Sequence, residues 1–200
     1  SARPASDGID MSNETPSDAS ANLQSQRQPL MFDDANRAQL WVDCSQRWFD
    51  NSDSLVQLNV QMLGHAEPPI LALEQRLAQS SPYSRATIEQ GALLMQCSAL
   101  SVYWLFGLYE TLRTLRQCAP RRFRVLEPLF HEVTVARMPL AKHQVKSARG
   151  YPRTEHYPTS VWDIQTGRVG WHVFDPNVEH MITVSRTDIA DRFLKIDCEK

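Results

Sequence analysis

An arginine and a histidine are separated by five residues in the segment Ala136-Arg137-Met138-Pro139-Leu140-Ala141-Lys142-His143. An imidazole can transfer a proton near neutral pH, and a guanidinium can hold a phosphate oxygen and stabilise developing negative charge. The residue before a proline avoids the α conformation, so we expect Met138 to end one helix and Pro139 to begin another that runs to about Ser147. This break would place Arg137 at the mouth of the second helix and His143 just over one turn inside it, with both side chains near one point.

The segment around this pair is basic, although the whole chain is not. The chain has 21 Lys and Arg against 23 Asp and Glu, a net charge of −2 that excludes an overall polycation. Residues 113–153 hold ten basic side chains against Glu127 and Glu132, which gives this segment a charge of +8. Such segregation predicts one basic surface for a phosphate-bearing partner. The alternative is a solvated charged face whose cations meet acidic residues of neighbouring helices.

The sequence from Arg137 to His143 resembles the signature of the higher eukaryote and prokaryote nucleotide-binding (HEPN) family. That signature is an Arg, four to six residues and a His at the start of the last helix of a small bundle, often as Arg-Asn-x-Leu-Ala-His. The chain is similar in having Leu140-Ala141 before the histidine, with Lys142 as one extra residue and Met138 in place of the usual polar residue. The likeness covers 34–150 by helix order and rests on these seven residues.

The resemblance implies metal-independent cleavage of RNA, in which the ribose 2′-hydroxyl attacks its own phosphate. His143 would be the general base or acid, and Arg137 would bind the phosphate. It also implies a homodimer in which two such pairs face one cleft, and no cofactor. Many relatives only bind nucleic acid or partners. We name as further nucleic-acid-binding candidates six residues of the basic segment: Arg121, Arg122, Arg124, Lys142, Lys146 and Arg149.

Structural interpretations of the same residues stay open. Arg137 could bond the end of the preceding helix, and His143 could cap or line a helix surface. If a bend at Pro128 turns His131 and Glu132 toward the break, Glu132 could orient an imidazole or pair with Arg137. Histidines 156, 172 and 180 match no zinc-ligand spacing, so we expect no metal site.

Helical periodicity dominates the chain up to residue 150. Apolar residues recur at helical spacing across 34–64, with an interruption expected near Asn51-Ser52. Gly64 is expected to end this helix and Pro68-Pro69 to open a shorter one. A second long helix begins near Ser84, and its apolar middle, 92–108, predicts a buried bundle helix rather than a membrane span. A further stripe over 123–133 precedes the expected break at Pro139.

Strand-type alternation follows after Gly150. Residues 160–164 and 168–174 predict a hairpin around the turn 165–167, with a third strand over 181–184. We expect Trp162, Trp171 and Phe174 to form a core between the hairpin and the bundle. Ser185-x-x-Asp188 caps a last helix that runs to about Lys195. The fold class is therefore α+β: a mainly α-helical bundle, then a small antiparallel β-meander and a C-terminal helix.

Three regions are expected: a disordered leader over 1–30, a helical bundle over 31–150, and a meander with its terminal helix over 151–200. The four scattered cysteines favour reduced thiols and a cytoplasmic protein without a membrane. The favoured function is a HEPN-like RNA-binding protein and metal-independent ribonuclease of toxin or defence type. The alternative is a non-enzymatic helical module for protein interaction or regulation, with the meander as its partner surface.

Overall fold

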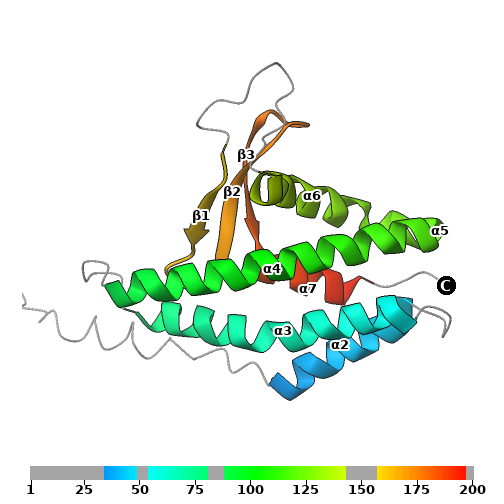
Figure 1. The fold of residues 1–200 in the computed structure, drawn as a ribbon, viewed down its shortest axis with the longest axis horizontal. Helices are drawn as coiled ribbons and strands as arrows, with labels where there is room; N and C mark the ends of the chain where they lie inside the picture. The colour runs from blue at the N-terminus through cyan, green and yellow to red at the C-terminus, as the bar shows by residue number, and fades with distance from the viewer. Residues whose placement is uncertain (1–33, 49–53, 81–87, 143–156, 197–200) are drawn as a thin grey trace, which may run out of the picture. The chain divides into compact units, whose positions relative to one another are not determined.

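The computed structural model describes residues 34–48, 54–80, 88–142 and 157–196, all within one compact unit, Phe32–Lys200. The predicted leader over 1–30 and the predicted interruption near 51–52 lie outside the described residues. The elements run in the order α2 (Asp34–Trp48), α3 (Ser54–Gln79), α4 (Ile88–Cys118), α5 (Pro120–Phe123), the 3-10 helix η1 (Arg124–Leu126), α6 (Glu127–Lys142), β1 (Thr159–Trp162), β2 (Val169–Asp175), β3 (His180–Ser185) and α7 (Arg186–Lys195). The fold is α+β, as predicted (Figure 1).

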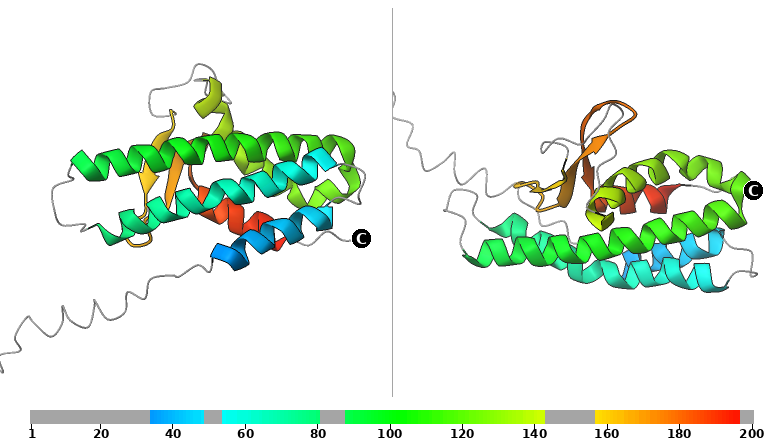
Figure 2. Two further views of the ribbon diagram at one scale, coloured as in Figure 1. Left: turned by 60° about the horizontal axis from the view of Figure 1, so that its bottom comes forward. Right: turned by 45° about the horizontal axis from the view of Figure 1, so that its top comes forward.

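Helices α2, α3 and α4 form a layer, in which α3 packs between α2 and α4. The helices α6 and α7 and the sheet cover one face of this layer (Figure 2). The core between them includes the fully buried side chains of Trp41, Trp48, Trp171, Phe123 and Phe193. Apolar burial on this scale is the main term that stabilises such a fold.

α4 is buried on one side only. Cys97, Trp104, Leu105 and Leu108 face the core, whereas Met95 and other apolar residues are exposed. The expected burial nearly all round is therefore wrong. By length and composition alone, α4 could cross a membrane; among the described residues it is the one helix that passes this test, which core helices of soluble proteins also pass.

The three strands form an antiparallel sheet in the order β1-β2-β3, so the predicted hairpin and third strand are confirmed. Val169, Trp171 and Val173 share the buried face of β2, and Trp162 packs against the same core. Phe174 lies half-buried on the opposite face of β2, so its predicted place in that core is wrong.

Gly167 brings the hairpin turn against α3. Its φ is +71°, and a Cβ there would lie 1.9 Å from the backbone oxygen of Glu74. A side chain would therefore be strained both by the backbone conformation and by contact with α3. The cap of α7 is also as predicted, because the Ser185 hydroxyl accepts a hydrogen bond from the Asp188 backbone N–H.

α3 continues through the residues that were expected to end it. Gly64 is buried inside the helix, and a Cβ there would lie 2.5 Å from the Trp41 side chain, so the glycine marks a close helix contact rather than a helix end. Pro68 and Pro69 also lie inside α3. A proline has no backbone N–H, so Pro68 and Pro69 each remove one hydrogen-bond donor from the helix. The residues on either side of the two prolines, Glu67 and Ile70, are buried, and their packing holds this part of α3 in the core.

α6 likewise shows no break at Met138-Pro139. It runs from Glu127 to Lys142 with Pro139 inside it, three residues before its end and buried. Pro128 is the second residue of α6, so this proline sets the start of the helix. The prediction that Pro139 begins a new helix is wrong, and Arg137 lies inside α6 rather than at a helix mouth.

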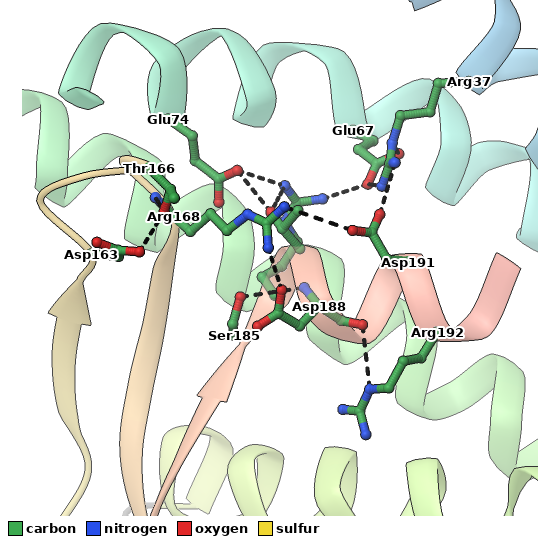
Figure 3. Close-up of polar contacts among 12 residues, drawn as sticks. Arg37, Glu67, Glu74, Asp163, Thr166, Arg168, Ser185, Asp188, Asp191 and Arg192 are labelled. Carbon is green, nitrogen blue, oxygen red and sulfur yellow. Dashed lines mark hydrogen bonds and ion pairs between the residues drawn. The ribbon is translucent and has the colours of Figure 1, made fainter. Parts of the chain in front are cut away.

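Two glutamates on the buried face of α3 bind arginines from α2 and the start of α7 (Figure 3). Glu67 accepts hydrogen bonds from Arg37 Nε at 2.7 Å, from Arg37 Nη2 at 2.8 Å and from Arg186 Nη1 at 2.6 Å. The Trp41 indole N–H also donates to Glu67, at 2.7 Å. Glu74 accepts from Arg186 Nη2 at 3.1 Å. We call these four charged residues, Arg37, Glu67, Glu74 and Arg186, the buried ion network.

The sheet and α7 extend this network. Glu74 accepts hydrogen bonds from the Thr187 hydroxyl at 2.7 Å and from the Val169 backbone N–H at 3.2 Å. Arg37 Nη1 donates to Asp191 of α7 at 2.8 Å. Burial of Glu67 opposes its ionisation, but its hydrogen bonds and the charges of Arg37 and Arg186 outweigh burial, so the pKa of Glu67 is lowered. The carboxylate is therefore ionised in the folded protein.

Removal of the Glu67 carboxylate would leave buried donor groups of Arg37, Arg186 and Trp41 without their acceptor, and each arginine would keep one acidic partner, Asp191 or Glu74. We expect Glu67→Ala to lower the free energy of unfolding by about 3–5 kcal/mol, measured by urea denaturation. Glu89→Ala is the matched control, because Glu89 is exposed and its carboxylate lies 4.0 Å from Arg76. Its loss should cost less than about 1 kcal/mol. Equal losses for the two variants would contradict a structural role for the network.

Candidate functional site

Arg137 is held between α6 and α4. Its guanidinium carbon lies 4.3 Å from the centroid of the Tyr109 ring, and Nη2 lies 3.5 Å from a carboxylate oxygen of Glu110. Nη1 also donates to the Met138 sulfur at 3.8 Å. The side chain is 21% exposed. Arg137 therefore joins two helices through a cation–π contact and an ion pair, which agrees with the structural interpretation of this residue.

The partners that the sequence assigns to Arg137 are not placed beside it. His143, Lys146 and Arg149 lie outside the described residues, as does the predicted stretch of helix up to 147. Lys142 is the last residue of α6, and its side chain also lies outside the described part. Convergence of Arg137 and His143 stays a prediction, although the helix break that was expected to produce it is absent.

The first three basic candidates lie at the corner between α4 and α6. Arg121 and Arg122 belong to α5, and Arg124 begins η1. Arg121 and Arg124 are exposed, and neither forms an ion pair with a described residue, whereas Arg122 is half-buried. We call these three residues the basic corner. It presents positive charge where phosphate oxygens could approach.

Two apolar side chains fix the basic corner on the protein. Phe123 is 1% exposed and Leu126 is fully buried, and they alternate with the arginines along the short helices. Pro120 begins α5 directly after the end of α4, which favours the turn between the helices. Phe123 and Leu126 therefore anchor the segment in the core on both sides of Arg124 and hold the arginines on a defined turn.

Other cations of the basic segment have acidic partners. Arg113 Nε lies 2.8 Å from Glu110, and Arg116 Nε lies 3.3 Å from Glu127. Together with the Arg137–Glu110 pair, these contacts match the predicted alternative in which cations of the segment meet neighbouring acids. They reduce the positive charge along α4 and leave the basic corner as the strongest cationic feature of the segment in the described residues.

A histidine and a buried aspartate form a second polar cluster between α6 and the sheet. His131 Nε2 lies 2.9 Å from Asp175 Oδ2 at the end of β2, and Asp175 Oδ1 accepts the backbone N–H of Asn177 at 2.9 Å. Burial opposes ionisation of Asp175, but the bonds from His131 and Asn177 outweigh it and lower the pKa of this carboxyl. A carboxylate that fixes an imidazole can orient it for proton transfer, and here it also joins α6 to β2.

Sequence reasoning missed the role of Asp175. The sequence Asp175-Pro176-Asn177 is typical of a turn, and nothing in it indicates a contact with α6. Pairing of Glu132 with Arg137 is not found among the described residues: the Glu132 carboxylate binds Arg192 of α7 at 2.5 Å and forms no hydrogen bond or ion pair with His131. An imidazole at His143 that Glu132 could orient lies outside the described residues.

Metal-ligating residues do not gather in the described part of the chain. No group of three His, Cys, Asp or Glu side chains there lies close enough to hold a metal ion. His172 is exposed on the sheet, and His180 Nδ1 lies 3.0 Å from the Val178 carbonyl oxygen. His156 lies outside the described residues.

Comparison with known proteins finds no family model, no curated protein and no solved structure that matches the chain.

Loss of the Asp175 carboxylate should change the pH dependence of stability. A carboxyl whose pKa is lower in the folded than in the unfolded state stabilises the fold above its unfolded pKa of about 4, and this contribution is lost as pH falls. We expect Asp175→Asn to cost about 1–2 kcal/mol of unfolding free energy at pH 7. The difference from the wild type should shrink as the pH falls below about 4.

Urea denaturation across this pH range measures the effect. Asp43→Asn is the matched control, because Asp43 is exposed and accepts a hydrogen bond only from the Gln39 side chain among the described residues. If the loss of unfolding free energy in Asp175→Asn did not change with pH, the ionised Asp175 carboxylate would not stabilise the contact between α6 and β2.

Proposed function

We propose that the protein is a HEPN-like RNA-binding protein that contacts phosphates through the basic corner. The observation that carries the proposal is the pair of exposed arginines, Arg121 and Arg124, which stand without an ion pair in the described structure. Arginine binds phosphate through a planar set of donors, and its charge persists at all physiological pH values.

The position of these arginines supports phosphate binding over a merely solvated face. Arg113, Arg116 and Arg137 show that cations of this segment pair where an acid is within reach. Arg121 and Arg124 are anchored by Phe123 and Leu126 instead and keep their charge outward. Lys142, Lys146 and Arg149 follow in the sequence and belong to the proposed RNA-binding set.

Neutralisation of the basic corner should weaken RNA binding and its salt dependence. For Arg121→Gln/Arg124→Gln, we expect the slope of log affinity for single-stranded RNA against log salt to fall by about 1.4, since each lost phosphate contact removes about 0.7. Fluorescence anisotropy across a salt series measures it.

The matched control for this experiment is Arg76→Gln/Lys195→Gln. It removes the same charge from exposed positions on α3 and α7 and should leave the slope unchanged. Equal slopes for the wild type and both double variants would refute the basic corner as the RNA site.

Cleavage is the finer part of the proposal. In it, His143 transfers the proton and Arg137 binds the phosphate, which requires the guanidinium of Arg137 to exchange its contact with Glu110 for a phosphate oxygen. Purified protein should then cleave mixed RNA in the presence of EDTA, and His143→Ala should abolish cleavage. Gel electrophoresis of the RNA is the readout. No cleavage by the wild type, or equal cleavage by the variant, would reject the catalytic part and leave RNA binding intact.

A non-enzymatic interaction module is the second candidate. The open edge of β1 favours it, because in the described structure β1 pairs with β2 only and its outer edge has no strand beside it. Such an edge can accept a strand of a partner protein. Under this function, neutralisation of the basic corner would leave partner binding nearly unchanged at physiological salt.

A further inference from the structure

The exposed face of α4 carries no charge over most of its length. From Gly91 to Tyr109 the sequence contains no Asp, Glu, Lys or Arg. One side of this stretch packs into the core through Cys97, Trp104 and Leu108. The other side faces solvent and carries large apolar side chains together with the polar Gln96: Met95 is 72% exposed and Tyr103 73%, and Ile88, just before this stretch, is 95% exposed. Large exposed apolar side chains gathered on one helix face mark an interaction surface.

A series of apolar residues on α4, four of them exposed, follows the spacing of a coiled coil. Steps of four, three, four, three and four residues join Ile88, Ala92, Met95, Ala99, Val102 and Phe106. Alternating steps of three and four produce a seam that runs along one side of a helix and packs against a partner helix. Val102 and Phe106 are half-buried and the other four are exposed. We call these six residues the α4 seam; it extends about 27 Å along the helix.

We propose that the α4 seam binds the same seam of a second copy of this chain, with the two helices antiparallel. In this register Met95 packs against the partner's Ala99, and Ala92 packs against the partner's Val102. Each of these layers sets a larger side chain against a small one, so the two helices can approach closely. At each end, Ile88 packs against the partner's Phe106. The seam is therefore complementary to itself under a twofold rotation.

The charges around the seam favour a second copy over a charged partner. The seam brings no like charges together when it meets itself, and a charged helix would lose its hydration there without gaining an opposite charge. The charges at its two ends already have local partners: Glu89 lies 4.0 Å from Arg76, and Glu110 lies 2.8 Å from Arg113.

The neighbouring helix widens the apolar surface. α3 packs beside α4, where Leu63 contacts the second half of α4 through Trp104. Leu55, Leu58 and Met62 of α3 are 71%, 49% and 58% exposed, and because α3 runs antiparallel to α4 they lie level with the Phe106 end of the seam and the residues after it. In the dimer, two α3–α4 pairs would then face each other, an arrangement akin to a four-helix bundle.

This inference is independent of the proposed RNA binding, because the basic corner lies outside the seam. It is tested with two single variants, Met95→Glu and Ala99→Lys, each of which puts a charge into the inner layer of the seam. Sedimentation velocity should show a dimer for the wild type and monomers for each variant at the same concentration. An equimolar mixture of the two variants should recover a dimer, since the introduced carboxylate and ammonium face each other only in the antiparallel register.

Controls separate this result from misfolding. Both substitutions lie at exposed positions, so circular dichroism should show wild-type helix content and melting. Gln46→Glu, an exposed substitution on α2, should remain a dimer. A monomeric wild type, dimeric single variants, or a mixture that stays monomeric would each overturn the proposal. Binding of monomeric wild type to neutral phosphatidylcholine vesicles, lost in Met95→Glu, would assign the seam to a membrane instead and also overturn it.

Discussion

The placement of two glutamates inside the core constrains the rest of the fold. Glu67 and Glu74 stand two turns apart on one face of α3, and neither can stay charged in an apolar interior without cations beside it. Arg37 comes from α2 and Arg186 from the junction of β3 and α7, so the requirement is met only when three distant parts of the chain meet at α3. Apolar packing supplies most of the stability, while this network specifies which helix lies where.

The same logic connects the sheet to the helices. Arg186 is fully buried, its guanidinium carbon lies 5.5 Å from the centre of the Trp104 ring, and it reaches both glutamates. Glu74 also holds the backbone of Val169 at the start of β2. The meander is thereby attached to α3 at one end, and the His131–Asp175 pair attaches it to α6 at the other. The sheet therefore connects α3 to α6 through the two ends of β2.

Local patterns predicted the elements well where local energetics decide them. Alternation of Val169, Trp171 and Val173 identified the strand, and Ser185 with Asp188 identified the start of α7. Prediction failed where a tertiary contact overrides local preference. The sequence pattern predicts a helix end at Gly64, which instead allows the close approach of Trp41, and a helix start at Pro139, which instead is buried inside α6. The buried ion network gave no sequence signal, because glutamate and arginine in a helical pattern usually indicate a solvent-exposed face.

The candidate site was predictable only in outline. The excess of charge over 113–153 identified the basic segment, and the order of residues Arg121 to Leu126 fits the alternation of exposed arginines with buried anchors. A basic side chain forms an ion pair only where folding brings an acidic side chain close to it, as it brings Glu110 close to Arg137. The spacing of residues along the sequence does not predict such a contact.

The distance along the chain between Glu67 and its partner Arg186 bears on how the protein is made. During synthesis α2, α3 and α4 leave the ribosome long before Arg186. Their shared core nevertheless contains carboxylates whose negative charges Arg186 must balance. Until α7 emerges, these three helices can pack together only with water or protons at Glu67 and Glu74. The packing of α2, α3 and α4 is therefore complete only once Arg186, at the start of α7, has joined them.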